Sequence, residues 1–66
     1  MKGPEHRPEI QLLGEDSNAF SILARVKVAL KEGGADNEYI EKIVAEATSG
    51  GYQHLLTTIM KYVDVR

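Results

Sequence analysis

The chain contains no cysteine, and this absence narrows the chemistry open to it. Without cysteine, disulfides, cysteine-ligated zinc sites and thiol-based catalysis are all excluded. Its 66 residues form one small domain, which buries only about 60% of the surface that the unfolded chain exposes. Such a domain must therefore gain its stability from regular helix packing or from self-association.

Long hydrophobic runs and a strong charge of one sign are also missing. No stretch approaches the roughly 20 apolar residues of a membrane span, and the start of the chain has no apolar run of the kind that a signal peptide needs. Eight Lys and Arg against ten Asp and Glu give a net charge of −2, which creates no general attraction to nucleic acid or anionic membranes. We therefore expect a cytoplasmic protein without a membrane partner.

The two ends of the chain differ from its centre. Residues 1–8 hold both prolines, a glycine and alternating charges, which predict a flexible leader that buries little surface, followed by a single domain over 9–66. An apolar run at 10–13 is typical of a brief strand or an extended arm. The β-branched, alternating residues 62–66 are candidates to pair with it.

Three segments have apolar residues at the spacing of one helix face, about 17–32, 36–48 and 51–62. Short connections make consecutive helices neighbours, so their apolar stripes must converge on one core. The sequence therefore predicts a mainly α fold, a compact three-helix domain, with the option of a short two-stranded ladder between the terminal arms. The side chains expected to meet in the core include Leu23, Val26, Ile43, Val44, Leu55 and Ile59, with Tyr52 on the stripe of the third helix.

Signals for the ends of the helices support these bounds. Asp16 or Ser17 is placed to cap the first helix, and Asp36 to cap the second, because their side-chain oxygens accept from amides of the first turn. Gly33 and Gly34 supply the left-handed stop between these two helices.

The first helix carries apolar and basic side chains away from its core stripe. Phe20 and Val28 lie off that stripe, so Phe20 either packs on a terminal arm or belongs to a surface that binds a partner. Arg25, Lys27 and Lys31 make the same helix basic, whereas the second helix is acidic. These charges either pair within the chain or support contact between two chains.

A helix-turn-helix interpretation rests on the third helix. Three helices with a glycine-containing turn before the third are typical of such DNA-binding domains. The acids of the second helix and the lack of arginine in the third oppose it, because phosphate contacts supply most of the affinity for DNA. The side chains that would face DNA are Gln53, His54, Thr57, Thr58 and Lys61.

Other chemistry finds little support in the residues. Asp16-Ser17 at a helix start is similar to the site where carrier proteins receive a phosphopantetheine arm, but Asn18 follows where a carrier has leucine, and capping explains the same residues. His6 lies in the leader and His54 on a polar face without a carboxylate one turn away, so neither indicates a metal site. Scattered carboxylates and a small core predict neither an enzyme nor a cofactor.

Two blocks of the sequence resemble a family of small uncharacterised bacterial and phage-borne proteins. They are GEDSNAFSIL at 14–23 and EATSGGYQHLL at 46–56, and the resemblance covers nearly all of the chain after residue 9. It implies no catalytic residue and no cofactor. We therefore expect a small protein-interaction or regulatory module that binds another protein or itself, with DNA binding as the less favoured alternative.

Overall fold

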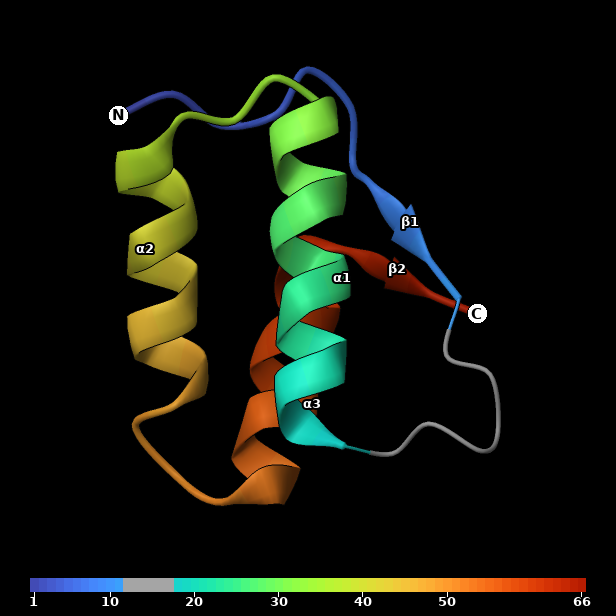
Figure 1. Cartoon of the computed structure of the whole chain (residues 1–66), viewed down its shortest axis with the longest axis vertical. Helices are drawn as coiled ribbons and strands as arrows, with labels where there is room; N and C mark the ends of the chain where they lie inside the picture. Colours follow the sequence, from blue (N-terminus) through green and yellow to red (C-terminus); the bar gives the residue numbers. More distant parts are fainter. Residues whose placement is uncertain (12–17) are drawn as a thin grey trace.

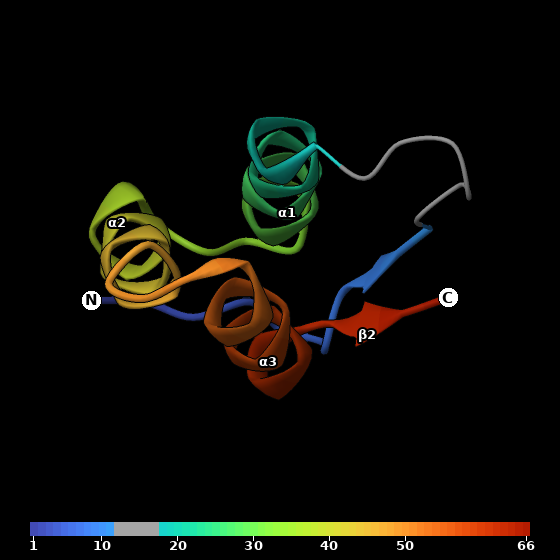
Figure 2. The same ribbon diagram turned by 90° about the horizontal axis from the view of Figure 1, so that it is seen from below.

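The computed structural model describes residues 1–11 and 18–66, and within these ranges the chain forms three helices and two short strands (Figure 1). Seen from below, the helices stand at the corners of a triangle, and the strands lie on the side away from α2 (Figure 2). The mainly α, three-helix fold predicted from the sequence is therefore confirmed. In chain order the elements are β1 (Glu9–Ile10), α1 (Ala19–Glu32), α2 (Asn37–Ala47), α3 (Tyr52–Tyr62) and β2 (Asp64–Val65).

The start of α1 lies two residues later than expected. Asn18 is its cap, and the Asn18 side-chain oxygen accepts from the amide of Phe20 at 2.8 Å. The caps expected from the sequence, Asp16 and Ser17, lie outside the described residues. Asn18 satisfies the same physical requirement, an oxygen aimed at an unpaired amide of the first turn.

The turn between α1 and α2 has the hydrogen bonds of a Schellman motif. Gly34 has a φ of 102°, in the left-handed region that glycine adopts without strain. Its amide donates to the carbonyl of Lys31 at 3.1 Å, and the amide of Ala35 donates to that of Leu30 at 3.0 Å. Ala35 and Leu30 are both buried, so the motif packs against the core. The chain then enters α2 at Asn37.

Asp36 caps α2 as predicted. Its carboxylate accepts from the amide of Tyr39 at 2.8 Å, and this hydrogen bond is the main reason that the pKa of Asp36 lies below its usual 3.8. A negative charge at this position also suits the positive end of the helix.

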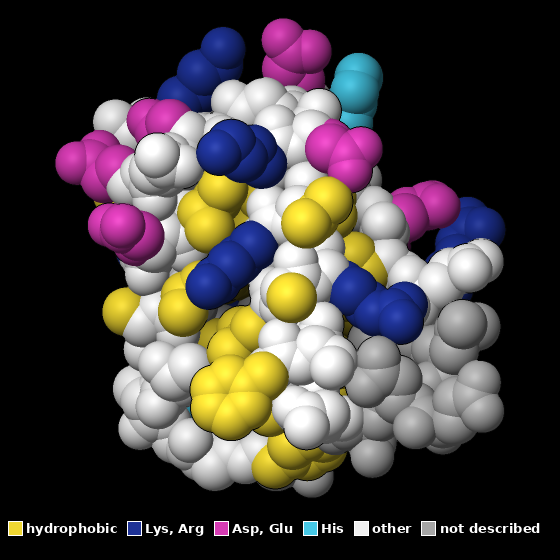
Figure 3. Space-filling view, in the orientation of Figure 1, with side chains coloured by type: hydrophobic (Ala, Val, Ile, Leu, Met, Phe, Trp, Pro, Cys, Tyr) yellow, Lys and Arg dark blue, Asp and Glu magenta, His cyan; other side chains and the backbone are white. Residues whose placement is uncertain are grey.

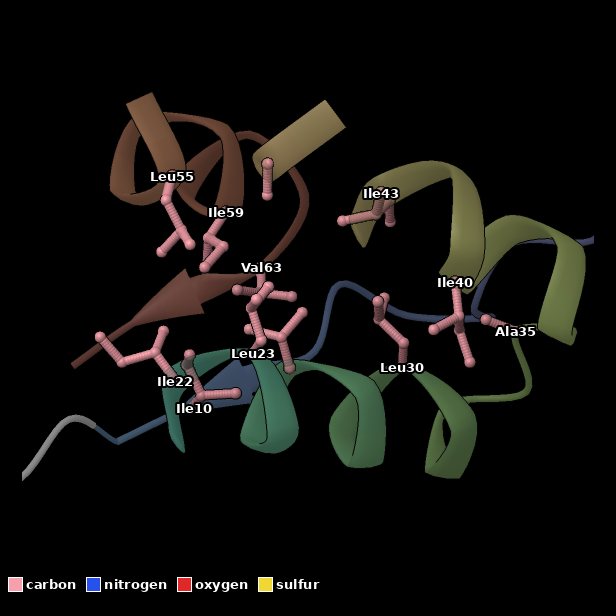
Figure 4. Packing of buried hydrophobic residues seen from close by; sticks show 12 residues of the cluster. Ile10, Ile22, Leu23, Leu30, Ala35, Ile40, Ile43, Leu55, Ile59 and Val63 are labelled. Carbon is pink, nitrogen blue, oxygen red and sulfur yellow. The ribbon is translucent and has the colours of Figure 1, made fainter. Parts of the chain in front are cut away.

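One hydrophobic core joins the three helices and β1. Side chains of α1 point toward those of α2 and α3 (Figure 4). Of the six residues expected to meet in the core, five are buried and Val44 packs half-buried against them. Tyr52 was expected in this core, but it is 46% exposed, so that prediction was wrong. The buried apolar residues are Ile10, Ile22, Leu23, Val26, Leu30, Ala35, Ile40, Ile43, Ala47, Leu55, Ile59 and Val63.

The two terminal arms form the short ladder that the sequence left as an option. β1 and β2 are parallel, with Glu9 opposite Asp64 and Ile10 opposite Val65. The amide of Asp64 donates to the carbonyl of Pro8 at 2.8 Å, which extends the ladder by one bond. Because Ile10 is buried, the ladder brings an apolar side chain from the start of the chain into the core.

Residues 1–8, the expected leader, are mostly exposed, and some of their backbone groups form hydrogen bonds at the ends of the helices. Lys2 and Asp36 exchange two hydrogen bonds: the Lys2 amide donates to the Asp36 carboxylate at 2.8 Å, and the Asp36 amide donates to the Lys2 carbonyl at 2.9 Å. The amide of Glu5 donates to the carbonyl of Gly33 at 2.8 Å. Proline and charge exclude regular structure here, but they do not prevent backbone groups from pairing one at a time.

Arg7 joins this segment to the end of α3. Its Nε donates to the carboxylate of Asp64 at 2.6 Å, and Nη1 donates to the carbonyl of Lys61 at 3.0 Å. Nη2 donates to the carbonyls of Met60 and Val63. Carbonyls in the last turn of a helix have no partner within the helix, and they carry its partial negative charge. The guanidinium therefore caps α3 from a distant part of the sequence.

We expect Arg7→Ala to lower the free energy of unfolding by about 1 to 2 kcal/mol, because the carbonyls lose a charged donor that is itself half exposed. Arg7→Lys keeps the charge but not the fork of donors. Its free energy of unfolding should therefore lie between those of the original protein and Arg7→Ala. Urea unfolding followed by circular dichroism measures both. Equal midpoints for the three proteins would show that the cap does not stabilise the fold.

Candidate interaction surface

The outer face of α1 combines exposed apolar and basic side chains. Phe20 is 83% exposed and Val28 57% exposed, although both belong to a helix whose opposite face fills the core. Lys27 and Lys31 are exposed on the same outer half of the helix. In Figure 3, hydrophobic and basic side chains alternate over this part of the molecule, and acidic ones gather over α2.

The exposure of Phe20 decides between the two interpretations of this residue. An aromatic ring packed on a terminal arm would be largely covered, whereas the Phe20 side chain is open to solvent. Leaving such a ring in water forgoes roughly 2 kcal/mol of burial free energy. A small domain gains nothing from that cost unless something else covers the ring.

Phe20 borders a shallow apolar hollow of about 220 Å³. The hollow lies between the start of α1 and the turn from α2 to α3. Its lining residues are Ala19, Phe20, Leu23, Thr48, Gly50, Gly51, Tyr52 and Leu55.

Charges on α1 and α2 are segregated in the structure as in the sequence. Within residues 1–11 and 18–66, no ion pair joins Lys27 or Lys31 to α2. Glu41 is exposed on α2 and takes no part in an ion pair of this described part either. Lys27 and Lys31 therefore do not pair with the acids of α2 in this part of the chain, where Glu38 instead contacts the N-terminal amine of Met1 at 2.9 Å and Glu46 contacts Lys61 at 3.8 Å.

Arg25 differs from the two lysines. It is half-buried, and its Nη1 donates to the carbonyl of Gln11 at 2.9 Å, just beyond β1. This contact lies beside a groove of about 620 Å³ between α1 and the N-terminal arm, which Val28 also lines. The five residues expected to form one partner surface therefore divide. Arg25 and Val28 line the groove, whereas helical periodicity places Phe20, Lys27 and Lys31 together on another flank of α1.

The polar face of α3 is less available than the sequence suggested. Thr58 was expected in solvent but is fully buried, because it packs in the interior beside Ile59. Lys61 lies 3.8 Å from the Glu46 carboxylate, and Thr57 donates its hydroxyl to the carbonyl of Gln53 at 2.9 Å.

His54, another member of that face, contacts the end of α2. Its Nε2 lies 2.9 Å from the carbonyl oxygen of Glu46 and 3.1 Å from the hydroxyl of Ser49. Since a carbonyl only accepts, Nε2 carries the proton in the first of these bonds. A Cβ at Gly50 would lie 2.8 Å from Cγ of His54, so the glycine makes room for the ring. Sequence spacing did not reveal this role, because the partner is a backbone oxygen eight residues away.

Glu46 links the last turn of α2 to the end of α3. The Tyr62 hydroxyl donates to its carboxylate at 2.7 Å, and the ring of Tyr62 meets that of Tyr39 edge to face with centroids 6.3 Å apart. The hydrogen bond to the carboxylate raises the pKa of Tyr62 above its usual 10.0. These contacts fix the angle between α2 and α3 and serve packing.

Neither histidine belongs to a cluster of acids and histidines in the described ranges, where no group of three such residues is placed to hold a metal ion. Ser17, the residue of the carrier-protein alternative, lies outside the described residues. The most distinctive surface in the described part of the chain is therefore the outer face of α1.

Comparison with protein-family models, with curated proteins and with solved structures finds no match to the chain. Among the helices described here, none is long and apolar enough to cross a membrane.

We expect Tyr62→Phe to lower the free energy of unfolding by about 1 kcal/mol near neutral pH through loss of the hydrogen bond to Glu46. The raised pKa means that the neutral phenol is favoured in the folded protein. The stabilisation from the hydrogen bond between Tyr62 and Glu46 is present below pH 10 and is lost as the pH rises through the pKa of Tyr62 in the folded protein. The difference between the two proteins, measured by urea unfolding, should therefore shrink above that pH.

Tyr39→Phe is the matched control, because it keeps the ring contact and removes a hydroxyl that takes no part in the bond to Glu46. A Tyr62→Phe protein as stable as this control at pH 7 would contradict the assignment.

Proposed function

We propose that this protein is a small protein-interaction or regulatory module without catalytic activity, and that the outer face of α1 is the surface that binds its partner. The observation that carries the proposal is the 83% exposure of Phe20 on a well-formed helix, next to an apolar hollow and two lysines without ion-pair partners in the described chain. Aromatic residues of this kind supply much of the binding energy at protein interfaces.

The composition of this face favours a protein partner over a nucleic acid. Two lysines around an aromatic ring offer few phosphate contacts, and acids lie close by on α2. On α3, the burial of Thr58 and the engagement of His54, Thr57 and Lys61 leave Gln53 to reach a base edge. DNA recognition through α3 is therefore not our proposal.

Two further parts of the proposal come from the sequence. We place the protein in the cytoplasm, because its composition lacks cysteine and a strong surface charge. We also propose membership of the family of small bacterial and phage-borne proteins that the blocks at 14–23 and 46–56 resemble.

A photoreactive benzoylphenylalanine in place of Phe20 tests the binding surface in the cell that makes the protein. We expect light to attach a protein to position 20 and not to position 53, because Gln53 is also exposed but lies on α3. Gel mobility and mass spectrometry identify the adduct. Equal or absent labelling at the two positions would overturn the proposal.

Phe20→Ser provides a second test with purified protein. Because the ring is exposed, its removal should leave the thermal midpoint within about 2 °C of the original while it weakens binding at least tenfold. A large fall in the midpoint would show instead that Phe20 serves the fold.

A further inference from the structure

We propose that the partner of this surface is a second copy of the chain, bound so that α1 of each copy lies antiparallel to α2 of the other. This inference rests on the proposed binding surface and specifies what occupies it. It follows from the positions of opposite charges on two neighbouring helices.

α1 and α2 stand side by side and run in opposite directions (Figure 1). Consider a twofold axis parallel to both helices, passing in front of the plane that contains them. A rotation of 180° about this axis keeps every atom at the same level along the axis. It therefore places α1 of the second copy against α2 of the first, with their levels unchanged. The two contacts made in this way are identical, as a closed dimer requires.

The register of the charges fits this arrangement. α1 ends at Glu32 and α2 begins at Asn37, with a short turn between them. Lys31 lies one residue before the end of α1 and Glu38 one residue after the start of α2, so the two stand at the same height. Lys27 and Glu41 are likewise level, about 4.5 to 6 Å further along their helices at 1.5 Å per residue. In the dimer Lys27 of one copy therefore meets Glu41 of the other, and Lys31 meets Glu38, whose carboxylate the N-terminal amine of Met1 also contacts at 2.9 Å.

The apolar half of the face lies at the opposite end of the same helices. Phe20 is in the first turn of α1, level with the end of α2, where Ala45 is exposed. Thr48 and Gly50 follow there and line the apolar hollow. The rotation thus brings Phe20 of each copy to the rim of the hollow in the other, and burial of the ring supplies the affinity that exposed charges do not.

The size of the face predicts a modest affinity. Helices of 14 and 11 residues, each about 10 Å wide, present an area of about 20 by 20 Å. That footprint of about 400 Å² is half of the about 800 Å² that a standard interface covers on each partner. We therefore expect a weak dimer, smaller than a standard interface, with a dissociation constant in the micromolar range or above.

Charge reversal on each helix tests the arrangement directly. In Lys27→Glu the two contacts both place glutamate against glutamate, and in Glu41→Lys both place lysine against lysine. Each variant alone should therefore dimerise at least tenfold more weakly in analytical ultracentrifugation. An equimolar mixture restores opposite charges at both contacts, so it should form a heterodimer about as tight as the original dimer.

Two matched controls carry the same charge changes on other flanks of the same helices. Glu32→Lys alters an exposed acid beside the groove between α1 and the N-terminal arm. Lys42→Glu alters an exposed base one turn before Glu46, on the side of α2 that faces α3. Both should dimerise like the original chain, and all four variants should keep its thermal midpoint.

Three results would overturn the inference: a monomer at the highest protein concentration reached, equal effects in variants and controls, or a mixture that stays monomeric. The photoreactive residue separates this failure from that of the proposed function. An adduct of two identical chains supports both proposals, and an adduct with a different protein supports the binding surface but not the second copy. If no adduct is specific to position 20, the binding surface itself is refuted.

Discussion

Burial of one stripe of α1 is the constraint on which the rest of the structure depends. Val26 and Leu30 are fully buried, and α2, α3 and β1 all contact this helix. A chain of 66 residues has little else with which to build an interior. Since one face of α1 is committed to the core, the opposite face is left over, and its apolar content has no role in the fold.

The position of α1 explains why its outer face is the candidate surface. α2 and α3 are tied to each other through Glu46, Tyr62 and His54, so their polar side chains are engaged in contacts within the domain. The outer side of α1 has no comparable network. The packing of this domain does not explain why Phe20, Lys27 and Lys31 are exposed. Binding of a partner to this face would explain it.

Features with a local cause could be predicted from the sequence. The three helices follow from their apolar spacing, the cap at Asp36 from its carboxylate, and the turn at Gly34 from the backbone that glycine allows. The off-stripe position of Phe20 followed from the same periodicity. These signals depend on residues within one or two turns of each other, so a single sequence contains them.

Features with a distant cause could not be predicted. The sequence predicts Thr58 on a polar face, but residues that are distant in the sequence pack around it and bury it. His54 and Arg7 bind backbone carbonyls, and a carbonyl leaves no mark in the sequence. The backbone hydrogen bonds of Lys2 to Asp36 and of Glu5 to Gly33 also have distant partners, which composition does not indicate. The same limit applies to the candidate surface, where periodicity found the exposed residues but not the division between Lys27 and Arg25.

The parallel ladder and the Arg7 cap have a consequence for how the domain opens. Arg7 and Asp64 are 57 positions apart, so their contact closes a loop of almost the whole chain, whereas each helix closes only local ones. Contacts that span such a loop are few here and partly exposed, and they are the kind that open first in partial unfolding. Amide hydrogens of the ladder should accordingly exchange with solvent faster than those of the helices, and the three-helix core should outlast the pairing of its ends.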